Sequence, residues 1–65
     1  MNSEEVKNHF AGITVYLFDG SKDELNDLMV ANGIGYGTLF ANHQLYFVVY
    51  DQSLSIPTDE RITEV

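Results

Sequence analysis

The chain has 65 residues, no cysteine and a net charge of −7, from ten acidic and three basic residues. These figures exclude a disulfide-stapled miniprotein, a cysteine zinc site and a thiolate nucleophile. They also disfavour direct binding to nucleic acid or anionic membranes, whose phosphates repel an acidic body. A hydrophobic fraction of 45%, with four Tyr and four Phe, predicts a folded chain, and the length allows one domain over residues 1–65.

The sequence predicts neither a membrane span nor a signal peptide. No stretch approaches the roughly 18 apolar residues of a membrane span. The first residues, Met1–Glu5, lack the basic start and apolar run of a signal peptide. With the absence of cysteine, these features predict a cytoplasmic protein.

The N-terminal segment, residues 3–11, is predicted to form a short helix with Ser3 as its N-cap and Gly12 after its end. Its apolar face would consist of Val6, His9 and Phe10. A helix of about two turns needs tertiary contacts to be stable, so an ordered coil is the alternative.

Residues 13–18 have high β-propensity and predict a strand that ends at Asp19-Gly20. Side chains alternate along a strand. One set is therefore Ile13, Val15 and Leu17, and the other is Thr14, Tyr16 and Phe18.

The main helix of the sequence is predicted to follow Ser21. Ser21 and Glu24 have the spacing of a capping box. The buried stripe would consist of Leu25, Leu28 and Met29. Asn32-Gly33 predicts the end of the helix, with Gly33 in the left-handed conformation and Ile34 closing onto Met29.

A β-hairpin is predicted next, with strands over residues 36–41 and 44–50 and a two-residue turn at Asn42-His43. This turn would pair Ala41 with Gln44, and the remaining pairs follow outward in order. Opposed residues share a face. One face would then hold Phe40, Leu45, Phe47 and Val49, and the other Leu39, Tyr46, Val48 and Tyr50.

The C-terminal segment is polar after Asp51, and Pro57 excludes a central strand nearby. Residues 61–65 are either a short edge strand or a frayed tail. The order of elements predicts an α+β fold, a small two-layer domain with a β-α-β-β core. One main helix would pack on a three- to four-stranded sheet, with the short N-terminal helix as an addition.

One sheet face is left without a predicted helix to cover it. We assign to this face Tyr16, Tyr46 and Tyr50, together with Phe18, Leu39 and Val48. An uncovered apolar patch rich in tyrosine is typical of a protein interface. The alternative is that residues 1–12 fold across it.

Candidate catalytic and metal-binding groups are few. His9 and His43 are far apart in sequence, and no metal-ligand spacing connects them to Asp19 or Asp51. The glycine-rich segment 33–37 leaves a helix and enters a strand, which is the reverse of a phosphate-binding loop. No cofactor, metal or catalytic residue is predicted, and the protein is expected not to be an enzyme.

Two further patterns have simple structural explanations. The strand-to-helix turn 18–21 has the geometry of an anion site but is surrounded by acids that would repel a phosphate. Asp19 and Asp23 could instead hold Mg²⁺ there, but a helix cap surrounded by solvated acids is the favoured explanation. The final Thr63-Glu64-Val65 has the form that some domains capture by strand addition, a form that also occurs frequently by chance.

The acidic residues are the main functional signal. Asp19, Asp23, Glu24 and Asp27 lie on or beside the main helix. They are either a solvated surface that maintains solubility or a recognition surface for a basic partner. We predict a non-enzymatic binding protein that occupies the basic, nucleic-acid-binding site of a larger protein.

The small size and acidity suggest a phage or mobile-element inhibitor of a host nuclease, restriction system or polymerase. The alternative is a structural or adaptor subunit that forms a homodimer through the tyrosine-bearing face or the edge strands.

Overall fold

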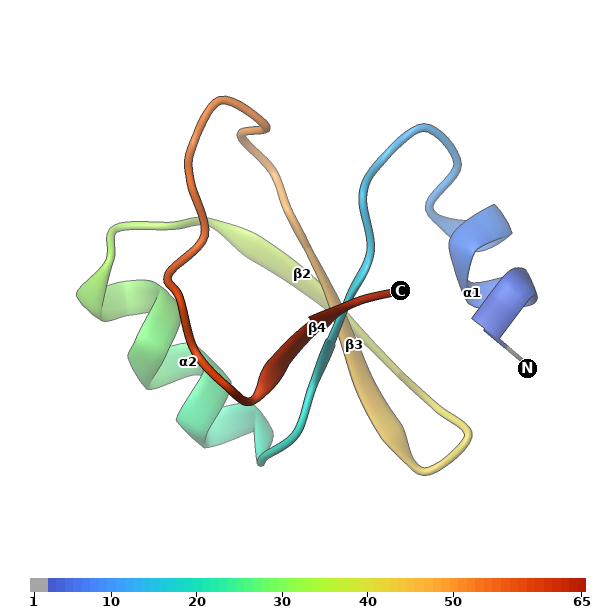
Figure 1. Ribbon diagram of the computed structural model, residues 1–65, viewed down its shortest axis with the longest axis horizontal. Coiled ribbons are helices and arrows are strands. Elements are labelled where there is room, and N and C mark those ends of the chain that lie inside the picture. Colours follow the sequence, from blue (N-terminus) through green and yellow to red (C-terminus); the bar gives the residue numbers. More distant parts are fainter. Residues whose placement is uncertain (1–2) are drawn as a thin grey trace.

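A computed structural model describes residues 3–65 and shows two helices and a four-stranded antiparallel sheet (Figure 1). The elements are α1 (Ser3–His9), β1 (Tyr16–Phe18), α2 (Lys22–Ala31), β2 (Tyr36–Ala41), β3 (Gln44–Val49) and β4 (Ile62–Glu64). The strand order is β2-β3-β1-β4. The predicted α+β class and its β-α-β-β core are confirmed, and the short N-terminal helix is present.

Both ends of α2 form as the sequence predicts. At its start, the backbone N–H of Glu24 donates to the Ser21 hydroxyl oxygen at 3.1 Å, and this hydroxyl donates to the Glu24 carboxylate at 3.2 Å. At its end, Gly33 has a φ of +67° and the Ile34 N–H donates to the Met29 carbonyl at 2.9 Å. This is the Schellman closure, which only a residue tolerant of the left-handed region completes without strain.

The hairpin also has the predicted register. Asn42 and His43 both have positive φ, at 54° and 59°, as a type I′ turn requires. Ala41 pairs with Gln44, and the pairing continues without interruption to Tyr36 and Val49. The local turn chemistry therefore determines the register of β2 and β3.

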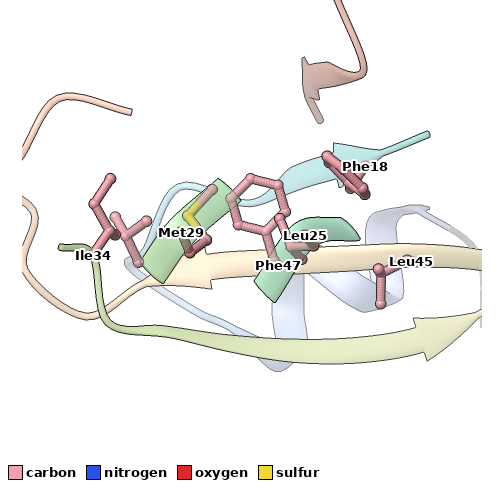
Figure 2. Close-up of a cluster of buried hydrophobic side chains, with 7 residues drawn as sticks. Phe18, Leu25, Met29, Ile34, Leu45 and Phe47 are labelled. Carbon is pink, nitrogen blue, oxygen red and sulfur yellow. The ribbon is translucent and has the colours of Figure 1, made fainter. Parts of the chain in front are cut away.

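The main core lies between α2 and one face of the sheet (Figure 2). It consists of Phe18, Leu25, Met29, Ile34, Leu45, Phe47 and Val49. Phe47 is fully buried at the centre of β3. Its ring stacks on Tyr16 at 5.3 Å between centroids and meets Phe18 edge-on at 6.4 Å.

A second core covers the opposite face of the sheet, where α1 packs (Figure 1). Val6 of α1 is fully buried against Val15, Tyr46 and Val48, with Phe10 beside them. Of the residues predicted to be uncovered, Tyr46, Val48 and Leu39 therefore lie under the N-terminal segment, as the alternative interpretation expected. The N-cap role predicted for the Ser3 side chain lies outside the described part of the chain.

The assignment of β1 side chains to sheet faces was wrong. β1 pairs with β3 so that Tyr16 opposes Phe47 and Phe18 opposes Leu45. Tyr16 and Phe18 therefore lie on the α2 face, and Tyr46 lies on the α1 face. Both sides of β1 are apolar, so the alternation of its residues does not fix which side meets which core.

The edge strand β4 settles the choice left open for residues 61–65. β4 pairs antiparallel with β1, with Phe18 opposite Ile62. The Val65 N–H donates to the Val15 carbonyl at 2.9 Å, and the Val65 side chain packs against the α1 core. β1 itself covers only Tyr16–Phe18, half of the predicted length.

Candidate functional site

The structure places the four acidic residues Asp19, Asp23, Glu24 and Asp27, here called the acidic edge, around the start of α2. Asp19 lies in the turn after β1, Asp23 and Glu24 lie in the first turn of α2, and Asp27 lies one turn further along. All four are exposed. Asp19, Asp23 and Asp27 form no ion pair with any described residue.

Asp23 and Asp27 project away from the sheet. Successive helical residues are separated by about 100° around the axis, and Leu25 and Met29 fix the direction of the core because both are fully buried. This rotation places Asp23 and Asp27 on the solvent side of α2. Their positions differ by about 6 Å along the axis, as four residues of an α-helix require.

Glu24 is held by Arg61, a residue that sequence reasoning did not assign to the site. An Nη atom of Arg61 lies 3.2 Å from a Glu24 carboxylate oxygen. The same guanidinium donates from Nε and from its other Nη to the two Asp59 oxygens at 2.9 and 2.8 Å. It also lies 5.1 Å above the Phe18 ring, within the range of a cation–π contact.

The hydrogen-bonded ion pair of Arg61 with Asp59, here called the Asp59–Arg61 fork, shifts the pKa of both residues. Hydrogen bonds from the Arg61 side chain and backbone lower the pKa of Asp59 to about 2 from its ordinary 3.8. The hydrogen bond to Asp59 also raises the pKa of Arg61 further above its ordinary value. The two-residue spacing of Asp59 and Arg61 was visible in the sequence, whereas Glu24 is 37 residues from Arg61 and no local pattern connects them.

A hollow of about 370 Å³ adjoins the acidic edge. Its polar lining includes Asp19, Glu60 and His43, and Phe40 forms part of its apolar wall. His43 belongs to the exposed hairpin turn. Three segments therefore meet around this hollow: the turn before α2, the hairpin turn between β2 and β3, and the residues before β4.

The three tyrosines predicted as a partner-binding face do not share a surface. Tyr46 is 1% exposed beneath α1. Tyr16 is half-buried against Phe47 on the opposite face. Tyr50 is exposed, and its ring lies beside Gly35 and Gly37, where an added Cβ would approach within 3.2 and 3.0 Å. The proposed aromatic surface does not exist in this fold.

The side chains considered as possible metal ligands lie apart from one another and have structural contacts of their own. The His9 ring meets Phe10 edge-on at 4.8 Å, and the Asp51 carboxylate caps a turn by accepting from the Ser53 N–H and hydroxyl at 3.0 and 2.6 Å. These bonds lower the pKa of Asp51. Across the described residues, no three His, Asp or Glu side chains are grouped as a metal site would require.

No helix among residues 3–65 has the length and apolarity to cross a bilayer.

Comparisons with known proteins identify no relative. No family model matches the chain, and no curated protein and no solved structure matches it.

The Asp59–Arg61 fork predicts an acid-sensitive contribution to stability. A carboxyl whose pKa is depressed on folding stabilises the folded state above its ordinary pKa and loses that contribution as the pH falls toward its folded value. For Asp59 this window runs from about 3.8 down to about 2. Asp59→Asn should therefore lower the Tm at pH 6, and the difference from wild type should disappear as the pH approaches 2.

Thermal unfolding followed by circular dichroism at a series of pH values checks this expectation. Arg61→Gln should give the same pH dependence, because it removes the group that holds the Asp59 carboxylate. A Tm difference that stays constant between pH 6 and pH 2 would contradict the assignment.

Proposed function

We propose that this chain is a non-enzymatic binding protein whose acidic edge docks on the basic, nucleic-acid-binding site of a larger protein. The observation that supports this most directly is the exposure of Asp19, Asp23 and Asp27 without an ion pair to any described residue. A partner's Lys or Arg side chains can engage these carboxylates without breaking an internal ion pair. Such contacts are charge-assisted and stronger than neutral hydrogen bonds.

The spacing of the acidic edge suits a site that normally holds nucleic acid. Asp23 and Asp27 are separated by about 6 Å along α2, close to the advance of two nucleotides at about 3.4 Å each along one strand. The net charge of −7 adds long-range attraction to a basic groove. The protein would then act as an inhibitor that competes with nucleic acid.

Within the acidic edge, the Glu24 carboxylate is held in place by internal hydrogen bonds. Its carboxylate accepts from both Ser21 and Arg61, so its position is set before a partner arrives. A preorganised carboxylate loses less conformational entropy on binding than a freely rotating one. The small size and acidity suit a phage or mobile-element factor directed against a host nucleic-acid enzyme, and this origin is part of the proposal.

The first experiment is affinity capture from a cell lysate with elution by a salt gradient, followed by displacement with DNA or RNA. A nucleic-acid enzyme that elutes at moderate salt and is displaced by nucleic acid is the expected result. If DNA or RNA displaces none of the captured proteins, the proposal is contradicted.

Charge reversal on the captured enzyme then tests the acidic edge itself. Asp23→Lys combined with Asp27→Lys leaves the Glu24–Arg61 pair in place. It should weaken binding at least about 30-fold, because two charged contacts are each worth more than about 1 kcal/mol. Adding Glu24→Lys should abolish binding, and affinities measured by calorimetry check both expectations.

The matched control is Glu4→Lys combined with Glu64→Lys, which changes the net charge equally on α1 and β4. This pair should alter affinity only through the long-range field, and the difference should shrink at high salt. Unchanged affinity of the variant that carries all three α2 reversals would refute the acidic edge as the docking surface.

A further inference from the structure

The edge strand β2 presents a row of backbone groups to solvent. The two-residue turn makes Ala41 and Gln44 a pair that exchanges both hydrogen bonds, and in an antiparallel ladder such pairs recur at every second residue. Tyr50 extends this series by donating to the Gly35 carbonyl at 3.0 Å. The N–H and C=O groups of Tyr36, Thr38 and Phe40 therefore point away from β3, and among the described residues they have no other backbone partner.

The two edges of the sheet differ in how they are protected. Natural sheets block their edges with charged side chains, proline, bulges or very short strands. β4 has three residues and carries Glu64. β2 has six residues with no charged side chain and no proline, and its pairing with β3 is uninterrupted. The β2 edge has none of these protections.

The side chains beside this edge leave apolar surface exposed. Tyr36, Thr38 and Phe40 oppose residues of the α2 core, so all three lie on the α2 face. Phe40 is 69% exposed. It borders a hollow of about 360 Å³ whose lining also includes Thr38 and Lys22.

We propose that β2 pairs antiparallel with β2 of a second copy of this chain, about a two-fold axis at Thr38. The outward residues Tyr36 and Phe40 are equidistant from Thr38, so each Phe40 would lie opposite Tyr36 of the other copy. Each of the three pairs formed in this way would exchange two backbone hydrogen bonds. Aromatic side chains opposed across strands stabilise the pairing, and the exposed Phe40 would gain a neighbour on the open side.

The charge distribution permits two acidic copies to meet at this edge. The α2 side chains directed toward β2 are Lys22, which lines the hollow with Phe40, and Asn26, which accepts from the Tyr36 hydroxyl at 2.6 Å. Neither is a carboxylate. Glu24 faces Arg61 on the other side of the helix, and Asp23 and Asp27 point away from the sheet.

The symmetry of this pairing favours a second copy over an open chain of copies. An isologous contact between identical strands closes as a dimer, whereas β2 paired with β4 of the next copy would continue as a fibre. Opposed residues share a face in the joined sheet, so both α2 helices would lie on the same side. This dimer does not depend on the proposed function.

The test is sedimentation of the wild-type protein over a concentration series up to about 1 mM, combined with amide hydrogen exchange. We expect a monomer–dimer equilibrium in which the amides of Tyr36, Thr38 and Phe40 become at least about tenfold more protected as dimer forms. Phe40→Lys should raise the dimer Kd at least about tenfold, since an edge lysine opposes strand pairing. Leu54→Lys is the matched control, because Leu54 is 40% exposed in the loop after β3, and it should leave the Kd unchanged.

Three results would overturn the proposal. The first is a monomer at every concentration, and the second is a species larger than a dimer. The third is a dimer in which the amides of Tyr36, Thr38 and Phe40 exchange as fast as in the monomer. The exchange measurement needs no substitution, so it decides the question even if Phe40→Lys fails to fold.

Discussion

Phe47→Ala is expected to lower the free energy of unfolding by about 3–5 kcal/mol. Phe47 is fully buried on β3, in contact with Tyr16 and Phe18 and covered by α2. Removing a buried Phe side chain costs about 3–5 kcal/mol through lost burial and the cavity that remains. A domain of this size has a total stability of only about 3–10 kcal/mol, so the loss consumes a large part of it.

The matched control for this substitution is Phe40→Ala. Phe40 belongs to the same sheet but is largely exposed, so its removal should change the free energy of unfolding by less than about 0.5 kcal/mol. Denaturant titrations at low protein concentration, where self-association does not contribute, compare the two variants. Equal stability of Phe47→Ala and Phe40→Ala would show that the core is not organised around β3.

The elements that were predictable from the sequence are those whose structure is decided within a few residues. Ser21 with Glu24, and Gly33 with Ile34, determine the two ends of α2 through bonds that span no more than five positions. The hairpin register follows from Asn42-His43 for the same reason, because a two-residue turn leaves one pairing. Each of these predictions depended on chemistry that is contiguous in the chain.

The register of β1 against β3 could not be derived in this way. Tyr16 and Phe47 are 31 positions apart, and α2 and β2 intervene between them. β1 is apolar on both sides, so no hydrophobic pattern distinguishes the α1 face from the α2 face. The wrong face for Tyr16, together with the cover that α1 provides over Tyr46, explains why the predicted tyrosine surface is absent.

In the candidate site too, the local features were predictable from the sequence and the long-range contact was not. Asp23, Glu24 and Asp27 lie on one helix, so their exposure around the start of α2 could be anticipated from helical periodicity. Arg61 reaches Glu24 only because β4 pairs beside β1, which brings the C-terminal segment next to the start of α2. A contact made by tertiary structure between exposed polar residues leaves no periodic signal in a single sequence.

Val6→Asp is expected to release α1 from the sheet. Val6 of α1 is fully buried, enclosed by Val15, Tyr46 and Val48. A carboxylate cannot remain ionised in that cluster without a partner. Loss of the Val burial alone costs about 1.5–3 kcal/mol. We expect a lower Tm, loss of amide protection in α1, and binding of a hydrophobic dye to the uncovered face.

Asn8→Asp provides the same charge change on the exposed side of α1, and its effect on stability should stay below about 1 kcal/mol. The comparison also tests whether α1 is what covers the sheet face that carries Tyr46. If α1 covers that face, then Tyr46 should become exposed in the Val6→Asp protein and stay buried in the Asn8→Asp protein. Only the Val6→Asp protein should then self-associate, through apolar contacts that salt does not weaken. A Val6→Asp protein as stable as Asn8→Asp, and equally unable to bind the dye, would mean that α1 contributes no cover and that the face is closed by other residues.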